Sequence, residues 1–167
     1  MKGWTHSLPY RKWKKDLIKY RKTAKKNRKS TNLCNKTKTF CKGAKNIPRR
    51  LMPQIYNHKR FSKKIRKNYN IGSKTIKLST KSLKPSQNEI NGEIVEKVVE
   101  SMKKTRRSKK EMPIVVSKDG YVVDGHHRWA AHKKMNPHKK IKALKIDAPI
   151  NDALGIAIST ETKRDSF

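Results

Sequence analysis

The chain has 167 residues, of which 45 are Lys or Arg and 12 are Asp or Glu, so its formal charge is +33. Apolar residues make up 33%, well below the roughly 45–50% of an ordinary globular domain, and we do not expect one packed core to run through the whole chain. No apolar run approaches the roughly 18 residues of a membrane-spanning helix, and the N-terminus has no apolar signal segment. We therefore expect neither feature.

The charge is concentrated in the first half of the chain. Residues 1–81 hold 27 Lys or Arg and one acid, a balance of +26, whereas residues 82–167 hold 18 and 11, a balance of +7. The asymmetry predicts a polybasic, largely disordered arm over residues 1–70 and a folded domain over residues 71–160. Such an arm needs a polyanion. We expect nucleic acid, DNA rather than RNA, because each phosphate contact releases counterions; an anionic membrane surface is the alternative.

Within the arm, residues 10–29 predict a short basic amphipathic helix, since Trp13, Leu17 and Tyr20 recur at helical spacing. The aromatic residues Trp4, Tyr10, Trp13 and Tyr20 either stack on bases or hold the arm on the folded half, and the sequence favours neither. The residues expected to contact nucleic acid are Lys12, Trp13, Lys14, Lys15, Arg21, Lys22, Lys25, Lys26 and Arg28.

Two further features of the first half lead to expectations. Cys34 and Cys41 have six residues between them and no second pair to complete a zinc site, so we expect two reduced thiols in a cytoplasmic protein. Pro48 and Pro53 disfavour a helix and predict an extended stretch over residues 47–55 that leads into the core.

The second half alternates strand and helix patterns. We expect strands over residues 74–80, 112–117, 121–124 and 141–147, and helices over 91–104, 126–135 and from Pro149 onward. Asn91 is the expected N-cap of the first helix, and Asp119-Gly120 is a strong hairpin signal. The order of elements predicts an α+β fold with a small mixed sheet.

Residues 121–131 carry the most informative motif. A strand ends, Gly125 turns the backbone, and a helix begins whose free N–H groups and partial positive charge favour an anion. We expect Gly125, His126, His127 and Arg128, with Gln87 of an earlier loop, to bind a phosphate. Asp124 either caps the helix or holds a Mg²⁺ ion that bridges phosphates.

The string Val-Asp-Gly-His-His-Arg-Trp-Ala-Ala at residues 123–131 resembles the signature of the ParB/sulfiredoxin-like (ParB-like nuclease domain) superfamily. The resemblance covers about residues 74–155 and implies that core fold, with CTP, ATP or ADP as the nucleotide and Mg²⁺ as the cation. The Asp-Gly-His-His-Arg form is closer to phage-encoded ParB-like proteins and to a free-serine kinase branch than to chromosome-partitioning ParB. The Cys of the sulfiredoxin motif is absent, so sulfinic acid reduction is not implied.

The kinase branch of that superfamily uses an acidic residue, in the loop before the first helix, as a base. Glu89 occupies the matching loop, so the resemblance implies a catalytic pair of Glu89 and Asp124. The competing interpretation is a capping box, because Ser86 and Glu89 have its spacing.

Three hypotheses about function follow. The first is a nucleic-acid-associated protein, phage-encoded and found in the host cytoplasm or in the virion, with a phosphate-binding or nucleotide-binding core and a basic arm. The second is an enzyme, either a metal-dependent nuclease or a nucleotide-dependent phosphotransferase or hydrolase. The third is a non-enzymatic virion or DNA-packaging protein. The sequence leaves the oligomeric state open.

Overall fold

The computed structural model describes residues 3–23, 31–37, 40–104 and 111–160. In these ranges the α-helices are α1 (Leu8–Thr23), α2 (Leu33–Lys36), α3 (His58–Tyr69), α4 (Gly92–Lys104), α5 (His126–Met135) and α6 (Ile150–Thr160). The strands are β1 (Ser73–Ser79), β2 (Lys84–Pro85), β3 (Ile114–Val116), β4 (Tyr121–Asp124) and β5 (Lys140–Ile146). Short 3-10 helices lie at Gly3–His6, Arg49–Leu51 and Thr80–Ser82.

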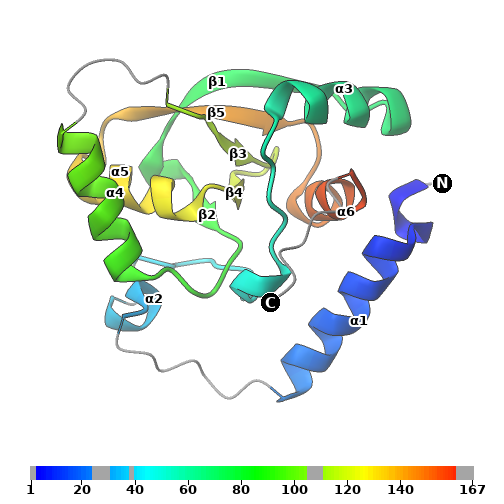
Figure 1. Cartoon of the computed structure of the whole chain (residues 1–167), viewed down its shortest axis with the longest axis horizontal. Coiled ribbons are helices and arrows are strands. Elements are labelled where there is room, and N and C mark those ends of the chain that lie inside the picture. Colours follow the sequence, from blue (N-terminus) through cyan, green and yellow to red (C-terminus); the bar gives the residue numbers. More distant parts are fainter. Residues whose placement is uncertain (1–2, 24–30, 38–39, 105–110, 161–167) are drawn as a thin grey trace.

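The strands form one mixed sheet in the order β1-β5-β3-β4-β2 (Figure 1). Strand β1 pairs antiparallel with β5, and β3 pairs antiparallel with β4. Strands β3 and β5, and β2 and β4, pair in parallel. The predicted α+β class is therefore confirmed, and every element predicted after residue 70 is present with boundaries shifted by at most two residues. Strand β2 was not predicted.

Helices cover both faces of the sheet because the central strands are apolar on both sides. In β3, Ile114 and Val116 pack into the cluster beneath α4 and α5, whereas Val115 packs into the cluster beneath α1, α3 and α6. Strand β4 divides Val122 and Val123 in the same way. This is the period-2 alternation of a strand buried on both faces. Figure 1 shows α4 and α5 on one side of the sheet and α6 with α1 on the other.

The described part of residues 3–70 is folded onto the rest of the chain, so the prediction of a largely disordered arm does not describe it. Trp4 and Trp13 are each 5% exposed, and Phe61 and Ile65 are fully buried in the same cluster as α6. The Trp13 indole N–H donates to the Leu51 carbonyl at 2.6 Å. The high charge misled the prediction because it lies on the outer faces of helices whose inner faces are apolar.

Helix α6 explains why the N-terminal residues are needed. It is apolar around most of its circumference, and eight of its eleven residues are buried, which requires cover on several sides. Gly155 lets the N-terminal 3-10 helix, Gly3–His6, approach closely. A Cβ atom at that position would lie 2.4 Å from Cδ1 of Trp4. The hydroxyl of Ser7, which lies between this 3-10 helix and α1, is 2.6 Å from the Ser159 hydroxyl of α6.

Three smaller expectations have clear outcomes. Asn91 caps α4 as predicted, since its Oδ1 accepts from the N–H groups of Glu93 and Ile94. The capping box is wrong, because α4 begins only at Gly92 and the Ser86 hydroxyl donates to the Val122 carbonyl. The expectation of reduced thiols is corrected by a disulfide between Cys34 and Cys41, whose Cα atoms are 5.1 Å apart.

Within the described ranges, no helix has both the length and the apolar character needed to cross a bilayer.

Candidate phosphate-binding site

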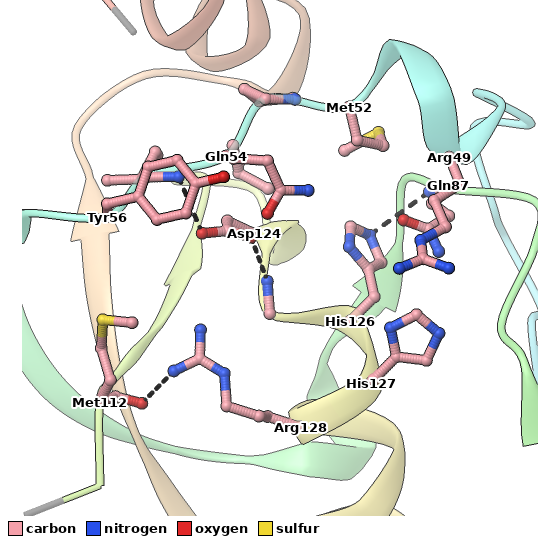
Figure 2. Close-up of a pocket in the computed structure, with 14 residues that line it drawn as sticks. Arg49, Met52, Gln54, Tyr56, Gln87, Met112, Asp124, His126, His127 and Arg128 are labelled. Carbon is pink, nitrogen blue, oxygen red and sulfur yellow. Dashed lines mark hydrogen bonds between the residues drawn. The ribbon is translucent and has the colours of Figure 1, made fainter. Parts of the chain in front are cut away.

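A cavity of about 370 Å³ lies where β4 ends and α5 begins. Its floor is the turn at residues 123–128, and its wall is a segment from the first half of the chain, residues 49–56. In Figure 2, Arg49 lies with His126 and His127 on one side, while Arg128 approaches Met112 and Asp124 on the other. The lining residues are Arg49, Met52, Pro53, Gln54, Ile55, Tyr56, Gln87, Met112, Val123, Asp124, Gly125, His126, His127 and Arg128.

Residues 47–57, which we call the strap, are fixed at both ends of the cavity wall. At one end, Ile47 makes a parallel bridge with Gln87, and its N–H donates to the Ser86 carbonyl at 3.1 Å. Near the other end, the Ile55 N–H donates to Oδ2 of Asp124 at 3.1 Å. Between them the two prolines hold the backbone extended, as predicted, apart from the 3-10 turn at Arg49–Leu51. The strap therefore belongs to the site.

Gly125 is required for the turn into α5. Its φ of 89° lies in the left-handed region, which side-chain-bearing residues rarely adopt. A Cβ atom there would also lie 2.8 Å from Nη2 of Arg128 and 2.9 Å from Cγ2 of Ile114. As the N-cap of α5, Gly125 offers no side chain to its N–H groups. The positive end of this helix thus faces the cavity without a side-chain cap.

Asp124 is a largely buried carboxylate that organises the turn. Oδ1 accepts from the Gly125 N–H at 2.8 Å, and Oδ2 accepts from the strap. It does not cap α5, so that alternative is wrong. Burial raises the pKa of Asp124, although these two N–H groups and the nearby Arg128 charge work in the opposite direction. Its two hydrogen bonds explain how the carboxyl joins the strap to the motif.

The two motif histidines are neutral. Burial, helped by the neighbouring His127, lowers the pKa of His126 to about 3. Burial, helped by the Arg49 charge, lowers the pKa of His127 to about 4. Nε2 of His126 accepts from the Ser86 N–H at 3.2 Å, and Nε2 of His127 accepts from the Asn91 N–H at 3.3 Å. Both rings therefore fasten the loop before α4 to the start of α5.

The cations of the site are two arginines from distant parts of the sequence. Arg128 lines the cavity and donates through Nη1 to the carbonyls of Met112 and Pro113. Arg49 is exposed at the cavity wall. A phosphate between them would meet two guanidinium groups and the N-terminus of α5, an arrangement suited to an anion.

The structure places the two remaining residues predicted for the core site differently. Gln87 lines the cavity, but its amide donates to the Glu89 carbonyl. Glu89 is half-buried in the loop before α4 and is not among the cavity-lining residues. Asp124 is therefore the one carboxylate that lines this cavity in the described part of the chain. A catalytic pair of Glu89 and Asp124 stays a prediction.

The described residues that line the cavity do not form a resident metal site. Among the described residues, no three His, Cys, Asp or Glu side chains are grouped as ligands. A single carboxylate with the Arg128 charge beside it is a poor ligand set for a divalent cation. Magnesium with Asp124 stays a prediction, and it would depend on a nucleotide whose phosphates supply the other ligands.

Of the residues predicted to bind nucleic acid, those in α1 fall into a buried group and an exposed group. Trp13 is buried, so its expected contact with bases is corrected, and for Trp4 and Trp13 the packing alternative holds. The exposed cations of α1 include Lys12, Lys14, Lys15, Arg21 and Lys22. Lys25, Lys26 and Arg28 lie outside the described residues.

Comparisons with known proteins give likenesses in structure alone. No protein-family model matches the chain, and no curated protein does. A solved structure of the pNOB8-like ParB N-domain is 23% identical, with a TM-score of 0.35, over 48% of this chain and 30% of that one. A C2221 form of a pNOB8-like ParB N-domain is 18% identical, with a TM-score of 0.37, over 50% and 33%. The chain thus spans about a third of the length of these structures.

Sequence reasoning missed Arg49, Gln54 and Tyr56 as site residues. The two prolines marked the strap as extended, but nothing local to residues 47–57 indicates which part of the chain the segment crosses. The one available signal was Ile47, Leu51 and Ile55, apolar residues too regular for a solvated arm.

Proposed function

We propose that this is a nucleic-acid-associated protein whose cavity at Gly125 binds a phosphate group of a nucleotide or nucleic acid. The observation that supports it best is the uncapped N-terminus of α5 opening into a cavity of about 370 Å³ between Arg49 and Arg128. That volume lies in the range of small-molecule sites. The neutral His126 and His127 hold the surrounding backbone in place, so the positive charge comes from the two arginines.

The finer parts of the proposal rest on the resemblance of residues 123–131 to the ParB/sulfiredoxin-like signature. It suggests CTP, ATP or ADP as the ligand and a phage-encoded protein. The exposed cations of α1 support contact with nucleic acid outside the cavity, because a helix face of this charge favours a polyanion. We propose binding and not turnover, because Glu89 does not line the cavity.

Two adjacent arginines provide a matched test of the phosphate site. Arg49 lines the cavity, whereas Arg50 lies over the Tyr20 ring, 5.7 Å from its centroid, and is not a lining residue. We expect Arg49→Ala to weaken nucleotide binding roughly 10–100-fold, the effect of losing a charge-assisted hydrogen bond. Arg50→Ala should leave the affinity unchanged. Isothermal titration with CTP, ATP, ADP and inorganic phosphate, with and without magnesium, measures both.

Arg128 gives the complementary result. Arg128→Ala should abolish binding, and Arg128→Lys should restore it only in part, because an ammonium cannot make a two-pronged contact. The alanine variant should also lose about 1 kcal/mol of stability, since Arg128 donates to the Met112 and Pro113 carbonyls. Equal losses of affinity in Arg49→Ala and Arg50→Ala, or no heat with any of the four ligands, would contradict the proposal.

A further inference from the structure

Helix α3 has a strongly basic surface without an acidic residue. Its inner face contributes Phe61 and Ile65, both fully buried. Its remaining surface carries six cations and no acid. In the described part of the chain, none of these six forms an ion pair. Lys64 donates to the Thr160 carbonyl at 3.3 Å. The exposed cations are Lys59, Arg60, Lys63, Arg66 and Lys67.

This pattern works against the stability of the helix. Lys59, Lys63 and Lys67 follow one another at i, i+4 spacing, where like charges repel. Two cations occupy the first turn, and no acid offsets the positive end of the helix dipole there. Helix α4 has the opposite arrangement, with Glu93 in its first turn, Lys103 and Lys104 in its last. The outer face of α3 thus keeps repelling charges that destabilise the helix, although its buried face is well packed. Such a conflict indicates a surface that serves binding and not stability.

The position of α3 connects it to the cavity. Tyr56 lines the cavity, and α3 begins two residues later, at His58. The pKa of the His58 ring is lowered by burial and responds to the charges of Asp124 and Arg128, so this end of α3 lies beside the motif. Twelve helical residues span about 18 Å, the length of about five phosphates along one strand of a duplex.

We propose that α3 is a nucleic-acid-binding helix whose outer face contacts the sugar–phosphate backbone. That the bound nucleic-acid strand continues from α3 into the cavity rests on the proposed function. The contact between the strand and α3 does not depend on it. An anionic membrane is the less suitable partner. A helix that lies in a bilayer surface buries its apolar face in lipid, and in α3 that face is already buried in the protein core.

Two triple variants with the same net charge test the proposal. The first, Lys59→Gln, Lys63→Gln and Lys67→Gln, neutralises one stripe of α3. The second, Lys97→Gln, Lys103→Gln and Lys104→Gln, neutralises three exposed lysines of α4 on the other side of the sheet. The probes are a labelled DNA single strand, an RNA of the same sequence, the DNA duplex and, for the membrane alternative, vesicles of anionic phospholipid. Fluorescence anisotropy over a range of salt concentrations gives the slope of log affinity against log salt.

The α3 variant should lower that slope by about 2 on single strands and by about 2.7 on the duplex, as expected for three lost phosphate contacts. The α4 variant should keep the parent slope. The comparison of DNA with RNA identifies the strand that is preferred. An α3 variant with the parent slope, or equal losses in the two triple variants, would overturn the proposal, as would a loss seen only on vesicles of anionic phospholipid.

The melting temperature and the affinity for free nucleotide are the two controls for the α3 variant. Glutamine is a good helix former, and removing the repulsion should leave the melting temperature of the α3 variant at or above that of the parent. A merely structural role would lower it. The α3 variant should bind free nucleotide as the parent does. If no free nucleotide binds but the α3 slope still falls, the phosphate site fails and the α3 interface stands.

Discussion

Acidification should remove about 5 kcal/mol of the free energy of unfolding between about pH 6.5 and pH 4.5. The main cause is the pair of motif histidines, whose folded pKa values are about 3 for His126 and about 4 for His127. His58, whose pKa is also lowered by burial, adds an effect of the same sign. In the unfolded chain both motif histidines take up a proton near pH 6.5. Below that pH the unfolded state holds more protons, so stability is present above pH 6.5 and is lost as the pH falls.

The loss approaches the whole stability of a typical domain. Asp124 opposes part of it. Its pKa is raised, so its contribution is present at low pH and is lost as the pH rises through the folded value. Two histidines should therefore give a slope of somewhat less than about 2.7 kcal/mol per pH unit, twice the value for one proton.

Urea unfolding at several pH values measures this slope. His126→Gln should halve it, because one of the two protons no longer binds differently to the folded and unfolded states, and His127→Gln should do the same. The free energy at pH 8 is compared separately, since losing the contacts to Ser86 and Gln87 destabilises the His126 variant at every pH. A slope unchanged by His126→Gln would mean that this ring does not stay neutral in the folded protein.

The second large effect concerns Gly155. Gly155→Ala should destabilise the protein by about 1–3 kcal/mol, the usual cost of overpacking, because the new methyl group would lie 2.4 Å from Cδ1 and 2.7 Å from Nε1 of Trp4. Trp4→Ala alone should cost about 3–5 kcal/mol. With Trp4 already replaced, the remaining close neighbour of the new methyl group is Cε2 of Tyr10, 3.1 Å away. Once that ring has shifted slightly, Gly155→Ala should cost little or stabilise by up to about 1 kcal/mol, because alanine is the better helix former.

Far-UV circular dichroism during urea unfolding measures all three variants without relying on the fluorescence of Trp4. Gly72→Ala is the steric control, since a Cβ atom there has no neighbour within 4 Å. If Gly155→Ala is equally harmful with and without Trp4, the indole is not what limits the size of residue 155.

The fold after residue 70 was predictable because its signals are local. The alternation in β1, the stripe of α4 and the turn at Gly120 each fix their own element whatever the rest of the chain does. The first half was predicted poorly because the prediction was based on its overall charge. Its folding depends instead on contacts with a segment of the same chain that is distant in sequence. Trp13 and Leu17 have helical spacing, but the surface that they cover belongs to α6. The sequence signal for this packing is α6 itself, which is apolar around most of its circumference and so needs cover on several sides.

The site shows the same division. Gly125 and its backbone role followed from the sequence alone, because a strand, a glycine and a helix start are adjacent there. The protonation states of His126 and His127 did not, since they depend on burial under the loop before α4. Arg49 could not be found from spacing, because it is brought to the motif by the strap across 76 positions of sequence from Gly125.

The contact between Trp4 and Gly155 also constrains how the chain can fold as it is made. On the ribosome, residues 4–17 emerge long before α6. The side chains of Trp4, Trp13 and Leu17 therefore stay exposed until the helix that they cover has been made. Pairs of such separation in sequence, like Ser7 with Ser159, close large loops and form late. The basic outer face of α1 keeps this segment soluble until it packs on α6. Assembly of this side of the molecule is thus expected to follow synthesis instead of accompanying it.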